Sequence, residues 1–356
     1  MTATRRDPAR KNNRGPVTPA TTLTEVASRA GVSLATASRV LNGSARSVGD
    51  ELRHRVLAAA AELDYIPNVH AQAMARGTSS VLGLIVHDIA DPYFSTIAAG
   101  VMAAAEESGL IVSLGSTLAS ADRELDYVAV LRAQRARALI LAGSRSSNVA
   151  QTRRLAREVQ AFRAAGGRVA CISQPLLGTD TVQPDNEAGA RALAGELVRL
   201  GHRRFGVLAG PATLLTARDR LFGFRAGLAD AGIDVPEAHI MPSSFDRDGG
   251  YAAAGGLLAL DAGVTCIFAV NDIMAVGAMA AIRDRGLSVP QDISVAGYDD
   301  IPTLRDVAPP LTTVRLPLHE LGRRAAELAL VGDEPPTPRV IPVHGEVVIR
   351  ASTRPL

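Results

Sequence analysis

Residues 22–42 carry the sequence Thr-Leu-Thr-Glu-Val-Ala-Ser-Arg-Ala-Gly-Val-Ser-Leu-Ala-Thr-Ala-Ser-Arg-Val-Leu-Asn, which decides how the N-terminal part of the chain folds. Four apolar residues recur at helical spacing and predict a short helix with one apolar face: Leu23, Val26, Ala27 and Ala30. Gly31 follows, and a residue without a Cβ tolerates the backbone of a tight turn. The stretch therefore predicts two short helices joined by a turn at Gly31.

The second predicted helix has a small, polar and basic outer side. Ser33 precedes it and offers its hydroxyl as an N-cap. We expect Ala37, Val40 and Leu41 to point toward the first helix. The outer side carries Leu34, Ala35, Ser38, Arg39 and Asn42. A helix of this kind, held at a fixed angle by its neighbour, fits the major groove of DNA.

Charge is unevenly distributed along the chain. The 356 residues have a formal net charge of +2. Residues 1–76 hold eleven basic and six acidic residues, a charge of +5, so the other 27 basic and 30 acidic residues give −3. A basic N-terminal part on a mildly acidic body is typical of a protein that contacts a polyanion at one end, although a solvated basic surface gives the same count.

The composition argues against secreted and membrane proteins. Cys171 and Cys266 lie inside apolar runs, which indicates buried thiols in a reducing compartment and no disulfide. The sequence shows no secretory signal and no apolar run long enough to cross a bilayer. We therefore expect a cytoplasmic protein without a membrane partner.

The chain divides into four predicted segments. Residues 1–20 are polar and lack periodicity, which predicts a disordered basic arm. Residues 21–67 form the helix-turn-helix domain with a third helix. Residues 68–80 combine a short helix-compatible stretch with a Gly-Thr-Ser-Ser joint. Residues 81–356 form the main body.

In the body, apolar strands alternate with helices. The predicted strands are 81–86, 110–114, 138–141, 169–172, 205–209, 266–270 and 293–297, and the helices between them include 94–107, 123–135, 187–200, 217–231 and 273–285. Near-continuous apolar strands separated by helices predict a parallel sheet covered on both faces. Seven units exceed one ordinary sheet, and a polar stretch at 179–186 divides them. We expect an α/β body of two doubly wound lobes with a cleft between them.

Ligands of doubly wound sheets bind beyond the carboxyl ends of the strands. Carboxylates and amides at these ends bind hydroxyl groups, and Tyr93 with Phe94 can cover an apolar ring, as a sugar or nucleoside site requires. Ordinary turn chemistry also favours Asp and Asn there. The polar and aromatic residues at the predicted strand ends are His87, Asp88, Asp91, Tyr93, Phe94, Ser116, Ser173, Gln174, Asn271, Asp272, Asp299 and Asp300.

The sequence lacks patterns that indicate catalysis. It contains no Gly-x-Ser-x-Gly elbow, no phosphate-binding glycine loop and no metal-spaced His and Cys cluster. Asp299 and Asp300 are a candidate pair for acid–base work, but adjacent side chains diverge on most backbones. We expect no enzyme activity, no cofactor and no metal site.

With these motifs in order, the chain resembles the lactose-repressor (LacI/GalR) family of bacterial transcription regulators, from about residue 22 to residue 354. The helix-turn-helix is similar to the family signature nearly residue for residue. Further similar stretches are 63–68, 271–278, 289–300 and 310–314. The resemblance implies a three-helix DNA-binding head and a two-lobed, periplasmic-binding-protein-like body that senses an effector and forms a dimer.

The resemblance places Leu34, Ala35 and Arg39 at base-reading positions. Arg39 suits guanine, with a phosphate contact as the alternative, and the two apolar side chains suit a thymine methyl. Met74 stands where the hinge helix of the family usually carries a Leu that wedges into the minor groove, although it could simply pack between hinge and body. The predicted DNA-binding residues are Thr22, Ser33, Leu34, Ala35, Thr36, Ser38, Arg39, Asn42, Asn68 and Met74, several of them on phosphates.

For the body, the resemblance implies an effector pocket. Arg218 is placed in it because sugar-responsive members grip ring hydroxyls with an arginine; a surface salt bridge is the alternative. The predicted lobes are 81–181 with 313–338, and 182–312 with 339–356. The predicted effector-binding residues are Asp91, Tyr93, Phe94, Arg218, Phe245, Asn271 and Asp299.

The predicted partners are a pseudo-palindromic DNA operator, a small effector of the sugar type and a second copy of the chain. No heptad pattern follows the last strand at 347–350, so a two-fold dimer is expected. Effector binding would move the lobes and thereby permit or forbid folding of the hinge. A transporter's solute-binding protein would lack the DNA-binding head, and a nucleotide-dependent enzyme would turn its ligand over.

Overall fold

The computed structural model describes residues 21–42, 48–66, 79–330 and 337–356. The chain forms two compact units, Met1–Arg76 and Gly77–Leu356, here called the head and the body. The predicted arm 1–20 and most of the predicted hinge segment 68–80, including Asn68 and Met74, lie outside the described residues. None of the described helices has both the length and the apolar character that a bilayer crossing requires.

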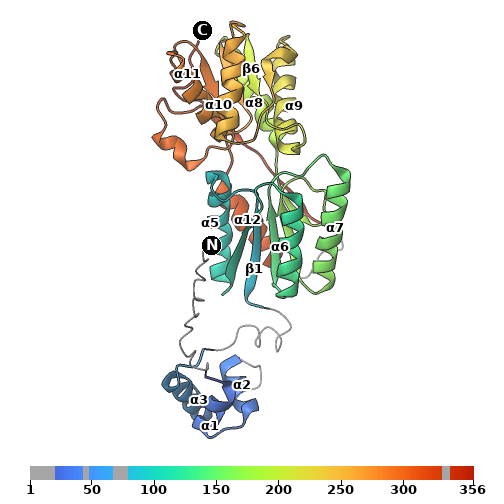
Figure 1. The fold of residues 1–356 in the computed structure, drawn as a ribbon, viewed down its shortest axis with the longest axis vertical. Helices are drawn as coiled ribbons and strands as arrows, with labels where there is room; N and C mark the ends of the chain where they lie inside the picture. Colours follow the sequence, from blue (N-terminus) through green and yellow to red (C-terminus); the bar gives the residue numbers. More distant parts are fainter. Residues whose placement is uncertain (1–20, 43–47, 67–78, 331–336) are drawn as a thin grey trace, which may run out of the picture. The chain divides into compact units, whose positions relative to one another are not determined.

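The head contains the helices α1 (Leu23–Ala30), α2 (Leu34–Asn42) and α3 (Asp50–Glu62) (Figure 1). Gly31 ends α1 with a left-handed backbone (φ 63°), as the sequence predicts. Arg55 of α3 donates hydrogen bonds to the carbonyls of Ala30 and Gly31, which ties the turn to the third helix. The fully buried side chains of Val26, Ala37 and Val56 join the three helices in one small core.

The first lobe of the body is built on a six-stranded parallel sheet with the order β11–β5–β4–β3–β1–β2. Four helices pack against this sheet or against each other (Figure 1). The strands are β1 (Val81–Val86), β2 (Ile111–Ser116), β3 (Ala138–Ala142), β4 (Arg168–Ile172), β5 (Asp180–Pro184) and β11 (Val340–Val343). The helices are α5 (Pro92–Glu107), α6 (Ala121–Ala133), α7 (Val149–Ala164) and α12 (Leu318–Leu330).

Alternating side chains of these strands enter two separate cores. Leu82 and Leu84 belong to the core that includes α5 and α12, whereas Ile85 joins Val128 and Phe162 of α6 and α7. Successive strand residues point to opposite faces, and both faces of this sheet are covered. This explains the near-continuous apolar runs in the sequence.

The second lobe has a four-stranded parallel sheet with the order β7–β6–β8–β9. Its strands are β6 (Phe205–Leu208), β7 (Ile240–Met241), β8 (Cys266–Ala269) and β9 (Ser294–Ala296). Its helices are α8 (Asn186–Arg199), α9 (Leu215–Ala229), α10 (Arg247–Ala259) and α11 (Asp272–Asp284), with short 3-10 helices η1 (Glu237–His239) and η2 (Pro302–Asp306). The antiparallel pair β10 (Thr313–Arg315) and β12 (Glu346–Val348) lies on segments that connect the lobes.

Two predicted boundaries between the lobes are wrong. The polar stretch at 179–186 contains β5, which pairs with β4 and continues the first sheet, so residues 182–184 do not belong to the second lobe. The predicted second lobe also includes residues 340–343, but they form β11 and pair with β5 of the first sheet. Both strands are short, and β11 contains Pro342 at the sheet edge, where a missing N–H is tolerated. Short strands with polar or Pro residues give little periodic signal.

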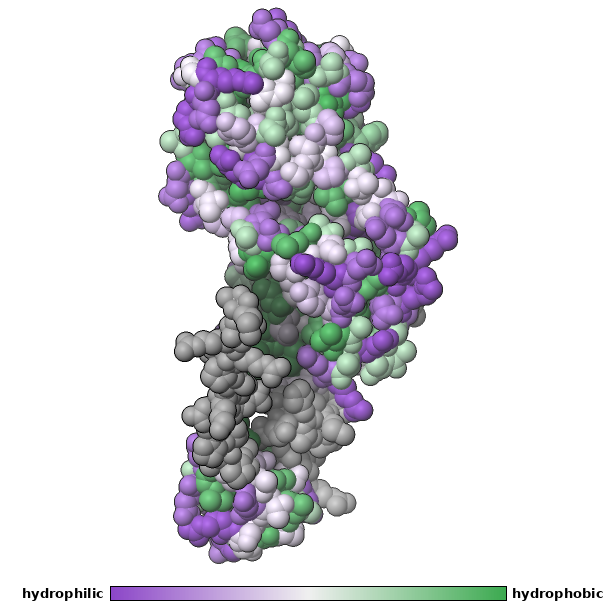
Figure 2. All heavy atoms as spheres, in the orientation of Figure 1, coloured by the Kyte–Doolittle hydropathy of each residue, from purple (hydrophilic) through white to green (hydrophobic). Residues whose placement is uncertain are grey.

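The core and the surface of the body follow the expected division of side chains. Both cysteines are buried and free. Hydrophilic residues are prominent on the face drawn in Figure 2, with apolar residues scattered between them. Such scattering is normal for a folded domain.

Candidate functional site

One side of α2 is exposed and carries four of the ten residues predicted to contact DNA. Leu34 is 50% exposed, and Ala35 and Arg39 are exposed beside it. Residues at i, i+1, i+4 and i+5 share one side of a helix, so the half-buried Ser38 completes this surface. The opposite side is anchored by Ala37, as predicted. We call Leu34, Ala35, Ser38 and Arg39 the α2 surface.

Other predicted DNA-binding residues hold helix ends in this structure. Thr22 caps α1 in a reciprocal pair with Glu25, whose carboxylate accepts from the Thr22 N–H at 2.7 Å. This pairing lowers the pKa of Glu25. Ser33 accepts a hydrogen bond from the Thr36 N–H at 3.1 Å, which confirms the predicted N-cap. Asn42 ends α2, and its side chain lies outside the described residues.

A cavity of about 650 Å³ lies between the two lobes of the body. It opens beyond the carboxyl ends of parallel strands, where ligands of doubly wound sheets bind. Its volume is in the range of small-molecule pockets. The cavity is lined by six of the seven residues predicted to bind the effector: Asp91, Tyr93, Phe94, Phe245, Asn271 and Asp299.

Arg218 is the predicted residue that does not line this cavity. It lies on α9 with 59% of its side chain exposed, 3.7 Å from Asp219. Arg220, two positions later, lines the cavity and is only 2% exposed. Two residues correspond to about 200° of rotation around a helix, so the two arginines point in opposite directions. Arg220 shares its side of α9 with the buried Ala217 and Phe224, a helical spacing that could have identified it from the sequence.

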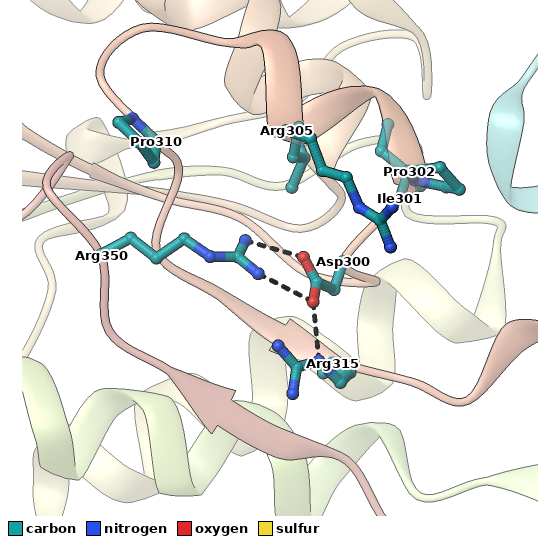
Figure 3. A pocket seen from close by; sticks show the side chains of 8 residues that line it. Asp300, Ile301, Pro302, Arg305, Pro310, Arg315 and Arg350 are labelled. Carbon is teal, nitrogen blue, oxygen red and sulfur yellow. Dashed lines mark hydrogen bonds and ion pairs between the residues drawn. The ribbon is translucent and has the colours of Figure 1, made fainter.

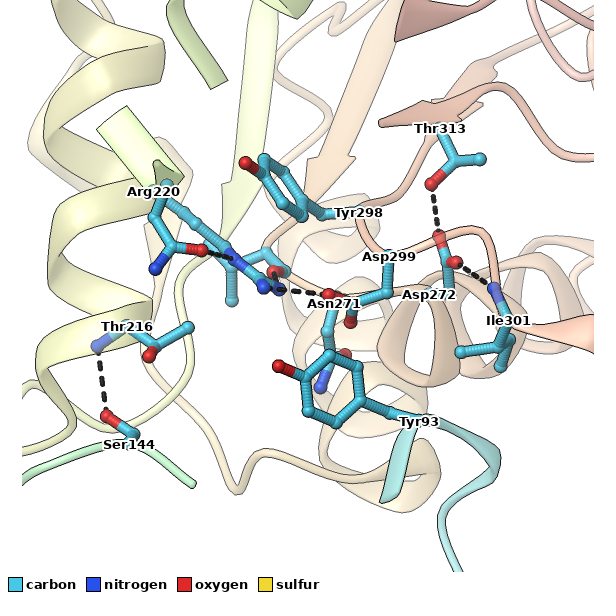
Figure 4. Close-up of polar contacts among 12 residues, drawn as sticks. Tyr93, Ser144, Thr216, Arg220, Asn271, Asp272, Tyr298, Asp299, Ile301 and Thr313 are labelled. Carbon is cyan, nitrogen blue, oxygen red and sulfur yellow. Dashed lines mark hydrogen bonds and ion pairs between the residues drawn. The ribbon is translucent and has the colours of Figure 1, made fainter. Parts of the chain in front are cut away.

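Arg220 is the centre of a buried polar network (Figure 4). Its guanidinium donates to Asn186 Oδ1 at 2.9 Å, to the Val270 carbonyl at 2.8 Å and to Asp299 Oδ1 at 2.7 Å. It also lies over the Tyr298 ring, 3.9 Å from the centroid. Burial raises the pKa of Asp299, and the positive charge of Arg220 opposes that shift. The network fixes one carboxylate and one guanidinium at the cavity wall.

Aromatic side chains form an apolar part of the same wall. Tyr93 and Phe94 meet edge to face, with ring centroids 4.9 Å apart. Burial raises the pKa of the Tyr93 phenol, so the hydroxyl stays protonated and can donate a hydrogen bond. Burial also lowers the pKa of the neighbouring His87 to about 4, which keeps that ring neutral.

Two of the predicted pocket residues also cap helices. Asp91 Oδ1 accepts from the Tyr93 N–H at 2.9 Å at the start of α5. Asn271 Oδ1 accepts from the Met274 N–H at 2.9 Å at the start of α11, while its amide lies 3.4 Å from the Phe245 carbonyl. The cap bonds hold both side chains at the cavity and use one oxygen of each.

Direct hydrogen bonds join the two lobes along one wall of the cavity. Gln174 of the first lobe donates to Thr216 Oγ1 and to Asp219 Oδ2, both at 3.2 Å. In return, the Thr216 N–H at the start of α9 donates to Ser144 Oγ at 3.0 Å (Figure 4). Since these bonds cross between the lobes, a change in the lobe angle must stretch or break them.

Asp300 does not join Asp299 in the cavity. It lines a separate hollow of about 270 Å³, where its carboxylate is bonded to Arg315 and Arg350 (Figure 3). These two guanidinium groups hold the pKa of Asp300 below its ordinary value. The two aspartates therefore diverge, as expected for adjacent residues, and do not form an acid–base pair. The described residues contain no cluster of His, Cys, Asp and Glu suited to a metal ion.

Comparison with known proteins assigns this architecture to a family. The description "Bacterial regulatory proteins, lacI family" matches residues 22–68, and a periplasmic binding protein-like domain matches residues 194–353. The HTH-type transcriptional regulator DegA of Bacillus subtilis (strain 168) is 33% identical over 341 residues, covering 94% of this chain and 99% of DegA. The chain belongs to the LacI family.

Two solved structures are similar to this chain over most of its length. The lac repressor dimer bound to operator and the anti-inducer ONPF is 31% identical, with a TM-score of 0.78 over 94% of this chain and 99% of that one. The CelR–cellobiose complex is 29% identical, with a TM-score of 0.68 over 93% and 99%. The relatives are regulators and not enzymes. This LacI-family chain is accordingly a DNA-binding transcriptional regulator with an effector-sensing body.

Proposed function

We propose that this regulator is a repressor whose effector is a sugar bound in the interlobe cavity. The observation that carries the proposal is the Arg220–Asp299 pair, which is buried in a cavity that also exposes Tyr93 and Phe94. A fixed carboxylate and guanidinium bind vicinal hydroxyls, and aromatic rings cover the apolar face of a sugar ring. The likeness to the CelR–cellobiose complex supports a saccharide.

We propose further that the α2 surface reads the operator. Arg39 suits the two acceptors of guanine, and Leu34 with Ala35 suits a thymine methyl. The lac repressor structure is a dimer bound to operator, which supports a two-fold dimer of this chain on a pseudo-palindromic site in the cytoplasm. In this proposal residues 68–80 form the hinge, and Met74 enters the minor groove.

The interlobe hydrogen bonds supply the link between the two sites. A sugar held by Arg220 and Asp299 in one lobe and by Tyr93 in the other changes the lobe angle at which Gln174 meets Thr216. An effector shifts DNA affinity only through such a difference between two states. Coupling free energies of this kind are typically about 1–3 kcal/mol, which corresponds to roughly 5- to 150-fold in affinity.

A thermal-shift screen of sugars and nucleosides on the full chain tests the ligand class. A sugar at about 100 times its Kd adds roughly 2.7 kcal/mol of stability and raises Tm. Asp299→Asn should abolish the shift, whereas Asp300→Asn, the matched control on the far side of the same segment, should retain it. A shift with nucleosides alone would refute the sugar assignment, and equal loss in both variants would refute the role of Asp299.

A further inference from the structure

Arginines gather at the amino end of the six-stranded sheet, on the opposite side of the first lobe from the effector cavity. Parallel strands all begin at this end, and α6 and α7 end there. Two acids offset part of the charge: Glu158 lies 3.4 Å from Arg132, and Asp180 pairs with Arg339. Glu106 and Glu107 end α5 beside the edge strand β2. The arginines are Arg132, Arg135, Arg137, Arg163, Arg168 and Arg339.

Backbone hydrogen bonds hold these residues next to each other. The Arg168 N–H donates to the Arg137 carbonyl at 3.3 Å, because β3 and β4 start side by side. A hollow of about 490 Å³ at this end is lined by Arg132 and Arg135 together with Phe162. The backbone therefore fixes this cluster at the amino end of the sheet.

Arg135 and Arg137 flank the place where the chain reaches the body from the head. The Ser79 N–H donates to the Arg135 carbonyl at 3.0 Å, and the Arg137 N–H donates to the Val81 carbonyl at 2.8 Å. Both side chains are exposed, and neither forms an ion pair with any other part of the chain that the structure describes. Arg135 also has φ 53°, a conformation that favours glycine at a helix end.

We propose that the surface formed by Arg135 and Arg137 is a second DNA contact, which binds phosphates of the duplex that flanks the site read by α2. The inference rests on the proposed function of the head. Residues 67–78 tether this surface to the head, and even a fully extended tether of that length spans only about 45 Å. Guanidinium groups bind phosphates well, and such contacts add affinity without reading sequence. The overall charge of −3 outside residues 1–76 conceals this basic end.

The salt dependence of DNA binding by the full chain tests the proposal. The probes are a duplex selected with the full chain from a random pool, and the same duplex extended by about 10 base pairs on each side. Each phosphate contact adds about 0.9 to the slope of log affinity against log salt. The wild type should show a slope steeper by about 2 per protomer on the extended duplex, and Arg135→Gln/Arg137→Gln should lose this difference.

Two further variants sharpen the test. Arg135→Lys/Arg137→Lys preserves both charges and should retain the extra slope. Arg153→Gln/Arg283→Gln removes two exposed arginines that lie away from the amino end of the sheet, and it should also retain the extra slope. Equal slopes for wild type and the Gln double variant on the extended duplex would overturn the inference while the proposed function stands. An equal loss of slope by the Gln double variant on the short duplex would also overturn the inference. A wild type that binds no duplex would overturn both the inference and the proposed function.

Discussion

Replacing Arg220 with methionine removes the cation that compensates a buried carboxylate. Asp299 is 4% exposed, and Arg220 also bonds Asn186 Oδ1 and the Val270 carbonyl, so the variant leaves three acceptors without their donor. Breaking a buried ion pair by removing one partner costs about 3–5 kcal/mol of folding stability. Methionine fills much of the same volume, so little of this loss comes from a cavity.

The pH dependence identifies the electrostatic part of that loss. Burial already raises the pKa of Asp299, and the loss of Arg220 raises it further. A carboxyl with a raised pKa binds more protons in the folded protein than in the unfolded chain. For Asp299, folding stability therefore falls as pH rises from the ordinary pKa of 3.8 to the folded-state pKa of about 8. The variant continues to lose stability up to its higher Asp299 pKa. The loss of unfolding free energy caused by Arg220→Met should therefore be larger at pH 9 than at pH 6, by about 1.4 kcal/mol for each unit by which the substitution raises the pKa between these two pH values.

Urea unfolding of the full chain, followed by circular dichroism, measures this cost. Arg218→Met is the matched control: Arg218 is mostly exposed, and its loss should change the unfolding free energy by at most about 0.5 kcal/mol. The double variant Arg220→Met/Asp299→Leu removes both charges and should be more stable than Arg220→Met alone. A cost below about 1 kcal/mol for Arg220→Met, or a double variant that loses the sum of both single costs, would refute the reasoning.

Two further predictions concern the protonation of His87 and the packing of two helical glycines. The pKa of His87 is lowered to about 4, so the folded protein binds fewer protons than the unfolded chain between pH 6.5 and 4. Folding stability should therefore fall by up to about 3 kcal/mol as pH falls through this window. His87→Gln should remove that part of the acid destabilisation. Urea unfolding at several pH values in this window measures it, and an equal loss of unfolding free energy in variant and wild type would contradict the prediction. A Cβ on Gly100 would lie 1.9 Å from the His319 carbonyl where α5 packs on α12, so Gly100→Ala should lower stability by about 1–3 kcal/mol or more. A Cβ on Gly195 of α8 would meet open space, so Gly195→Ala should raise folding stability by up to about 1 kcal/mol. A higher melting temperature for Gly100→Ala than for Gly195→Ala would refute the packing of α5 on α12 described here.

Local chemistry explains what could be predicted from the sequence. The turn at Gly31 and the cap at Ser33 depend on residues within a few positions, so the head could be derived from one stretch. The pocket aromatics Tyr93 and Phe94 could be placed because strand ends in parallel sheets converge.

Features that depend on long-range pairing could not be derived in this way. β5 and β11 gain their place only by pairing with strands far away in sequence. The bond between Gln174 and Thr216 exists only because the lobes meet. The family resemblance favours Arg218, although the helical phase of the buried residues on α9 favours Arg220.

The most direct test of the central claim is the affinity of the full chain for its selected duplex, measured with Arg39→Ala and with a control in the head. Arg39→Ala should weaken specific binding by about 1–3 kcal/mol and relax preference at one base pair. Arg29→Ala, which removes an exposed partner of Glu62, should leave the sequence preference unchanged. If Arg39→Ala binds the selected duplex with the affinity and preference of the wild type, the α2 surface does not read DNA and the account is wrong.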